Sequence, residues 1–259
     1  METKPTQKPT VKSVMQNESV QKRFHEMLGK NAAGFCANLA VMVSNSQALS
    51  KCEPMSVVSA AVISASLNLP LDPNLGFAAV VPYGDKAQFQ IMYKGLVQLA
   101  MRSGQYETIG VAEIYEGQLV SENPLTSDYV FDFAAKKSDK VIGYAAYFRL
   151  INGFHKTIYW PVEQIDRHGK RFSQVYKRGS GLWKDDFDSM ARKTVLKNLL
   201  SKWGILSIEM QTAQKYDQSV VADITEDAEP IYIDNDELPE KSFDPATEKI
   251  EANSEKLAL

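Results

Sequence analysis

The chain has 259 residues, of which 44% are hydrophobic and 24% charged, a balance that favours a globular protein with one large domain or two small ones. Two cysteines and three histidines are too few for a disulfide framework and lack metal-ligand spacing, and no apolar run is long enough to cross a bilayer, so we expect a reduced, cytosolic protein without structural zinc. The net charge of −3 conceals an asymmetry, because residues 211–259 hold 13 acidic and 4 basic side chains (net −9), and residues 1–210 hold 19 and 25 (net +6). A basic body with an acidic tail is compatible with a nucleic-acid partner.

The first half of the chain is predicted to begin with helices. Residues 1–16 are rich in Pro, Thr and Lys and are expected to be disordered. Helical patterns follow over 18–50, with a break near Gly34, and over 54–68, where Pro54 suits a first helical turn. Residues 77–93 alternate in polarity around the turn YGDK and predict a β-hairpin, and a helix over 94–103 follows directly.

The second half is predicted to contain short strands and a long helix. Strands are expected over 106–117, 129–133, 141–150 and 157–160, with Asn152-Gly153 as a tight turn between the last two. A short helix over 161–169 and the loop RFSQVYKRGSG lead to a long helix over 183–202.

This order predicts an α+β fold, with N-terminal helices and a small antiparallel sheet with a hairpin, backed by a long C-terminal helix. Residues 1–16 are then a disordered N-terminus, and residues 17–210 form one domain. Residues 211–259 form an acidic flexible tail or a small partner-binding module.

The stretch QFQIMYKGLVQLAMRSG (88–104) changes from a strand period to a helix period at Tyr93. Lys94 and Arg102 then fall on one polar ridge of the helix, two turns apart. A half-buried strand followed by an amphipathic helix accounts for this pattern. An anion site accounts for it as well, because a helix N-terminus has free N–H groups and a lysine beside it favours phosphate.

Two enzyme classes lack their sequence signatures. No GxxxxGK[ST] phosphate loop is present, and the nearest glycine cluster, RGSG at 178–181, has neither the spacing nor the following lysine. Asp185, Asp186 and Asp188 crowd one helix start, whereas a two-metal nuclease needs carboxylates that converge from separate elements. Because the helix dipole favours acids at this position, we interpret the three as structural and expect neither catalytic residues nor metal ligands.

Residues 160–205 are both basic and aromatic. Ten Lys and Arg stand against five acids, a net charge of +5, and Phe172, Tyr176 and Trp183 lie among them. Cations that pair with phosphates, alternating with rings that stack on bases, are typical of proteins that bind single-stranded nucleic acid. The alternative is a solvated basic helix whose aromatic rings belong to the core.

Two longer stretches resemble the RecT family of phage single-strand annealing proteins. VVPYGDKAQFQIMYKGLVQLAMRSG (80–104) is similar to the family's hairpin, Tyr-Lys-Gly junction and Arg-Ser-Gly helix end. WKDDFDSMARKTVLKNLLSKWGILS (183–207) is similar to its tryptophan, acidic pair, Met-Ala-x-Lys-Thr helix and closing aromatic residue. The spacing between these blocks is similar too, and the resemblance covers roughly residues 20–210.

The resemblance implies a function and a set of partners. It implies a core like that of the Red-beta and Rad52 annealing proteins, which binds single-stranded DNA and anneals it through a duplex intermediate, without ATP, in phage recombination and DNA repair. It implies a homo-oligomer, as a ring or helical filament, in the cytoplasm of a bacterial host, with a 5′-to-3′ exonuclease and the host single-strand binding protein as partners and no membrane. No cofactor is implied, although a non-specific dependence on magnesium stays open. The alternative is a passive protein that coats single-stranded DNA without annealing it.

The residues predicted to contact DNA come from both blocks and from the region between them. In this hypothesis Lys94 and Arg102 line one wall of a phosphate groove. Arg192, Lys193 and Lys197 form another wall, and the loop over 170–184 closes over the strand. Gly95 is expected to allow a close approach to the backbone. The full predicted set is Lys86, Tyr93, Lys94, Arg102, Arg149, Lys170, Arg171, Phe172, Tyr176, Lys177, Arg178, Trp183, Arg192, Lys193 and Lys197.

The acidic tail over 211–259 has two interpretations. Its charge suits an intramolecular DNA mimic that competes with the strand for the basic groove. Its prolines and sparse apolar pattern also suit a flexible segment that docks partner proteins.

Overall fold

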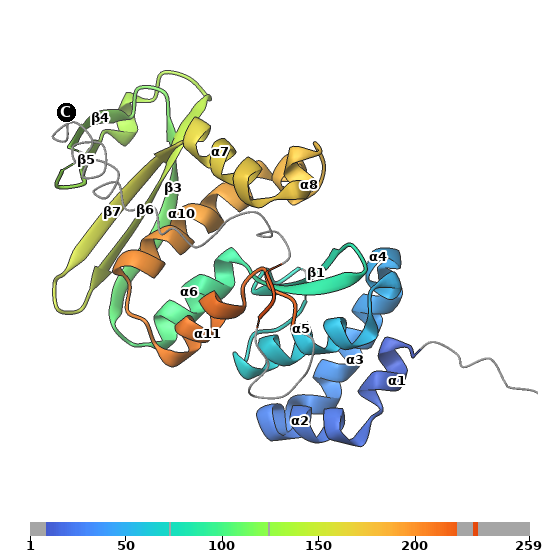
Figure 1. Cartoon of the computed structure of the whole chain (residues 1–259). Coiled ribbons are helices and arrows are strands. Elements are labelled where there is room, and N and C mark those ends of the chain that lie inside the picture. Colours follow the sequence, from blue (N-terminus) through green and yellow to red (C-terminus); the bar gives the residue numbers. More distant parts are fainter. Residues whose placement is uncertain (1–8, 73, 124, 222–229, 233–259) are drawn as a thin grey trace, which may run out of the picture.

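The computed structural model describes residues 9–72, 74–123, 125–221 and 230–232, and it has the α+β architecture that the sequence predicts (Figure 1). The first five helices and a two-stranded hairpin form one end of the body, and a three-stranded antiparallel sheet forms the other. One hydrophobic cluster runs from Val11 to Val221, so both ends share a continuous core. Within the described residues, no helix is both long and apolar enough to cross a membrane.

The N-terminal helices pack around a central one. Their bounds are α1 Val11–Met15, α2 Glu18–Leu28, the short 3-10 helix η1 Gly29–Asn31, α3 Ala32–Asn45, α4 Gln47–Lys51 and α5 Pro54–Ser66. α5 is buried on nearly every side, because its small side chains let α1, α2 and the hairpin approach closely. Pro54 takes the first helical turn of α5, as predicted.

The structure corrects two predictions in this region. The described part of the segment expected to be disordered contains α1, which starts with a capping box on Thr10 and buries Val11 and Met15. The helix break falls at Gly29, whose φ of 53° suits glycine, whereas Gly34 lies inside α3. Residues 1–8 lie outside the described residues.

The predicted hairpin consists of β1 (Ala78–Tyr83) and β2 (Lys86–Ile91), and α6 (Tyr93–Arg102) starts directly after it. Gly95, in the first turn of α6, is buried against the backbone that leads into β1. A β-carbon at Gly95 would lie 2.1 Å from the Phe77 carbonyl oxygen. The close approach predicted at this glycine is therefore a packing contact inside the protein rather than an approach to a ligand.

The larger sheet has the order β3-β6-β7 and carries α10 (Phe187–Trp203) across one face (Figure 1). Its strands are β3 Tyr106–Tyr115, β6 Val141–Leu150 and β7 His155–Pro161, all antiparallel. A second hairpin, β4 (Leu119–Asn123) and β5 (Asp128–Phe131), and the 3-10 helix η2 (Phe133–Ala135) are inserted between β3 and β6. β4 was not predicted, because its mostly exposed side chains have no alternating pattern.

Among the described residues, three further helices precede α10 in the chain, and one follows it. They are α7 Val162–Phe172, α8 Gln174–Lys177, α9 Leu182–Asp185 and α11 Ile208–Tyr216. The single helix expected over 183–202 is divided at Asp186, whose φ of −147° and ψ of 72° are not helical. The domain boundary expected after residue 210 falls inside α11, and Asp217, Val220 and Val221 are buried, so residues 211–221 pack with the body. Apart from residues 230–232, the rest of the predicted tail lies outside the described residues.

Candidate nucleic-acid interface

α10 presents one face to the sheet, and charged side chains fix it there. Asp186 caps the helix by accepting a hydrogen bond of 3.1 Å from a first-turn amide. Asp188 accepts a hydrogen bond from the buried Tyr144 hydroxyl of β6, and Arg192 pairs with Glu113 of β3. Burial and the neighbouring carboxylate raise the pKa of Tyr144, so its hydroxyl keeps its proton at neutral pH. No group of three or more His, Cys, Asp or Glu that could hold a metal ion occurs among the described residues.

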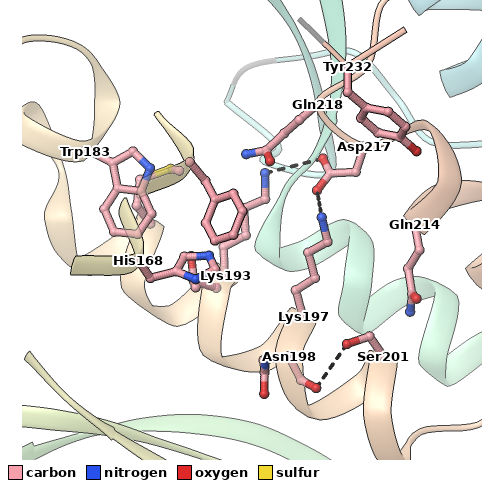
Figure 2. Close-up of a pocket in the computed structure, with 13 residues that line it drawn as sticks. His168, Trp183, Lys193, Lys197, Asn198, Ser201, Gln214, Asp217, Gln218 and Tyr232 are labelled. Atoms are coloured by element: carbon pink, nitrogen blue, oxygen red, sulfur yellow. Dashed lines mark hydrogen bonds and ion pairs between the residues drawn. The ribbon is translucent and has the colours of Figure 1, made fainter. Parts of the chain in front are cut away.

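The opposite side of α10 lines a cleft of about 290 Å³ (Figure 2). α7, α9 and α10 contribute to one side of the cleft, and α11 and the segment after it contribute to the other. Lys193 and Lys197 both point into the cleft, as their i, i+4 spacing predicts (Figure 2). The Lys193 side chain is only 3% exposed and that of Lys197 is 31% exposed. His168, Asn198 and Gln218 add polar groups to the lining.

A second hollow extends the cleft toward the β1–β2 hairpin. Phe172, Trp183, Met190 and Gln218 line both spaces, so the two adjoin along α9 and α10. The hairpin forms the far wall of the second hollow. We call the two spaces together the α10 groove, and its principal lining residues are Tyr83, Gln90, His168, Phe172, Trp183, Met190, Lys193, Lys197, Asn198 and Gln218.

The predicted aromatic residues gather near one part of this groove. Tyr176 stacks on Trp183 with ring centroids 5.5 Å apart, and its hydroxyl donates a hydrogen bond of 2.6 Å to Asp166. Phe172 packs on His168 at a centroid distance of 4.6 Å. Trp183 is only 7% exposed, so its ring belongs mainly to the core. Burial, with a smaller effect of nearby cations, lowers the pKa of His168 to about 4, which leaves the imidazole neutral at pH 7.

Beside the groove, the segment 171–184 carries four exposed cations. Arg171, Lys177, Arg178 and Lys184 make no ion pair with any residue that the structure describes. Lys170, which was predicted with them, is paired at 2.7 Å with a carboxylate one turn earlier in α7. We call the four unpaired cations the basic rim. Within the described part of the chain, a phosphate can approach these four cations without breaking an ion pair.

Two of the predicted arginines are instead engaged with the protein. Arg102 donates hydrogen bonds of 2.7 and 2.8 Å to the carbonyl oxygens of Leu67 and Asn68, and so caps the end of α5. Arg149 pairs with Glu107 at 2.7 Å across β6 and β3. The fold uses Arg102 to cap α5, a role that the sequence did not indicate, and its place in a phosphate groove stays a prediction.

The remaining predicted residues lie at several separate places in the fold, and none of the four named next lines the α10 groove. Lys94 is exposed in the first turn of α6 and does not line the α10 groove. Tyr93 is half-buried against the core, and Lys86 is half-buried at the start of β2. The wall expected from Arg192, Lys193 and Lys197 is divided, because Arg192 pairs with the sheet whereas the two lysines face the groove.

Replacing Arg102 by alanine is expected to lower the free energy of unfolding by about 1–2 kcal/mol, because two charge-assisted hydrogen bonds to the end of α5 are lost. Lys94→Ala, on the same helix, is the matched control and is expected to change it by less than about 0.5 kcal/mol. Urea unfolding followed by circular dichroism measures both. Equal stability of the two variants would contradict the capping role of Arg102.

Asp217 is the part of the site that sequence reasoning missed. Its buried carboxylate lies between Lys193 and Lys197, at 3.6 and 2.5 Å from their ammonium nitrogens (Figure 2). In the sequence it is a single acid within QKYDQS, close to the start of an acidic region. No local spacing marks it, since its lysine partners belong to another helix.

A small antiparallel sheet backed by a long helix, with lysines and aromatic rings along one groove, has the features of an α+β protein that binds single-stranded nucleic acid. Comparison with known families is more specific: residues 33–232 match the RecT family, and the chain belongs to it. The resemblance drawn from the two sequence blocks is thereby confirmed. Family membership supports a role in DNA recombination by single-strand annealing.

Two relatives extend this comparison. The chain is 50% identical to the uncharacterized protein YqaK of Bacillus subtilis (strain 168) over 240 residues, which are 89% of this chain and 83% of that protein. It is 30% identical to Protein RecT of Escherichia coli (strain K12) over 181 residues, which are 66% of this chain and 65% of that protein. The likeness to both proteins extends well beyond the two short blocks.

Proposed function

We propose that this protein binds single-stranded DNA along the α10 groove and anneals it to a complementary strand without ATP. The observation that carries the proposal is that Lys193 and Lys197 line a groove together with Phe172 and Trp183, while the basic rim lies in the adjoining segment 171–184. Cations of this kind contact phosphates, and rings stack on any base, so binding is independent of sequence.

The annealing reaction itself needs only binding. Two phosphate backbones that repel each other must be brought together while their bases stay exposed. Lysine and arginine offset the repulsion, because each contact with a phosphate releases condensed counterions. No covalent bond is made or broken, so we propose a binding protein rather than an enzyme, without a cofactor; a non-specific effect of magnesium on strand repulsion stays open.

We further propose that the protein acts as a homo-oligomer, as a ring or a helical filament. One groove holds a short length of strand, and an oligomer repeats the groove so that many weak contacts add along the DNA. In this proposal a 5′-to-3′ exonuclease exposes the strand, and the host single-strand binding protein is a second partner in the cytoplasm of a bacterial host.

Energy transfer between two complementary labelled oligonucleotides tests the proposal. We expect the protein to make pairing several-fold faster without any nucleotide, and to leave unrelated oligonucleotide pairs unchanged. Binding without faster pairing would favour a passive coating protein. Metal-dependent shortening of a labelled strand would favour a nuclease and contradict the proposal.

A further inference from the structure

The groove lysines are already bridged by a carboxylate of this chain. Asp217 is the first residue after α11, and its side chain is fully buried. Its carboxylate accepts a hydrogen bond of 2.5 Å from Lys197 and one of 3.0 Å from the Ile91 amide of β2. Lys193 lies 3.6 Å away on the same side (Figure 2). One anion therefore holds two cations of the candidate DNA site together.

Asp217 does not satisfy all the hydrogen-bond donors of the two lysines. The Lys193 ammonium is buried, yet it makes no hydrogen bond to any described residue, and the ion pair at 3.6 Å is its one charge contact there. An ammonium group has three N–H donors. Two lysines against one carboxylate also leave a net charge of +1, which attracts a phosphate to the cleft, where it competes with Asp217 for the lysines.

Electrostatics keep Asp217 ionised in this position. Burial alone would raise the pKa of its carboxyl group, but Lys193, Lys197 and the hydrogen bonds hold the pKa below its usual range. Burial lowers the pKa of the Lys193 ammonium, and Asp217 offsets part of that effect. The lysines therefore need an anion nearby, and a carboxylate or a phosphodiester supplies it.

Asp217 belongs to a segment that is held next to the groove by backbone hydrogen bonds and by the buried side chains of Val220 and Val221. The Gln218 amide donates to the Phe89 carbonyl oxygen of β2 at 2.8 Å. The amide of Val220 donates to the Ile231 carbonyl oxygen, and the reverse bond is also formed, both at 2.8 Å. These bonds accompany two isolated antiparallel bridges, one between Ser219 and Phe89 of β2 and one between Val220 and Ile231.

We propose that the C-terminal segment, residues 217–221, autoinhibits the DNA site by placing the Asp217 carboxylate where a DNA phosphate binds. A phosphodiester has two non-bridging oxygens and a single negative charge, so it replaces the carboxylate between the two lysines without changing the local charge. DNA binding then releases the segment from β2. This inference rests on the function proposed above, because it concerns the same lysines.

Asp217→Asn is the direct test, since asparagine keeps the size and the acceptor for the Ile91 amide but loses the charge. We expect affinity for a poly-dT oligonucleotide to increase about tenfold, as for one additional charge-assisted phosphate contact. Glu209→Gln is the matched control, because it removes one exposed acid from α11 that has no contact with the groove lysines. A folded Asp217→Asn variant with unchanged or weaker affinity would overturn the proposal.

Hydrogen exchange on the unmodified protein gives a test that does not depend on how the variant folds. With saturating poly-dT, we expect the amides of Ile91, Gln218 and Val220 to lose protection, because their present acceptors move or leave. If DNA binds while these amides stay protected, the segment is a structural element and the autoinhibition is wrong. If the protein binds no single-stranded DNA at all, the proposed function fails first, so the two failures are distinguishable.

Discussion

Replacing Gly95 by alanine is expected to prevent stable folding or to lower the free energy of unfolding by about 3 kcal/mol. The new β-carbon would lie 2.1 Å from the Phe77 carbonyl oxygen and 2.9 Å from a side-chain carbon of Ile91. The Phe77 carbonyl also accepts a hydrogen bond of 3.0 Å from the Met92 amide, so it cannot retreat without opening the junction between hairpin and α6. Overpacking of buried sites typically costs about 1–3 kcal/mol, and a clash with backbone belongs at the upper end.

Gly34→Ala is the matched control for this prediction. Gly34 lies inside α3, and a β-carbon there would meet nothing within 4 Å. Alanine has the higher helix propensity, so this variant is expected to gain up to about 1 kcal/mol. Thermal unfolding followed by circular dichroism compares the two substitutions. A Gly95→Ala protein as stable as the wild type would mean that α6 does not pack this closely on Phe77.

The junction at Tyr93 shows which features of the fold are local enough to predict. The hairpin turn at Gly84 and the change of period at Tyr93 depend on neighbouring residues, and the structure confirms both elements there. The close approach predicted at Gly95 is confirmed, but the group that approaches was not predictable, because Phe77 precedes β1 and reaches Gly95 only through the pairing of the hairpin. A glycine in the sequence indicates that another group can come close to the backbone, but it does not indicate which group does so.

The same distinction applies to the candidate site. Helix spacing placed Lys193 and Lys197 on one face of α10, and both do face the groove. Their burial was not predictable from helix spacing. It depends on Asp217, which follows α11 in the chain and contacts both lysines of α10. Arg102 has partners more than 30 residues earlier in the chain, and these partners give it a capping role that helix spacing does not indicate. Periodicity predicts which cations share a face, whereas distant partners decide which of them are free.

The basic rim differs from the groove lysines in whether its cations already have an acidic partner. Lys193 and Lys197 are already paired with Asp217, so DNA must exchange one anion for another to reach them. The rim cations are exposed and make no ion pair with the described residues, so a phosphate gains their attraction without such an exchange. We therefore expect the rim to supply most of the salt-dependent part of the affinity.

Replacing Lys177, Arg178 and Lys184 together by alanine is expected to weaken binding of a poly-dT oligonucleotide roughly 10- to 100-fold near physiological salt. The slope of log affinity against log salt concentration should fall by about 2, because each phosphate contact to a single strand contributes about 0.7. The three side chains are exposed, so the free energy of unfolding should stay within about 0.5 kcal/mol of the wild type per substitution. Fluorescence anisotropy at several salt concentrations measures both quantities.

The control removes the same charge from another part of the surface. Lys12, Lys30 and Lys51 are exposed on the N-terminal helices, and none of them lines the α10 groove. Their triple alanine variant has the same net charge as the rim variant, so long-range attraction of DNA to the whole protein falls by a similar amount in both. Only the rim variant loses direct phosphate contacts, and only its salt slope should fall by the full amount. Equal losses in the two variants would mean that affinity follows net charge alone, and the assignment of phosphate contacts to the rim would be wrong.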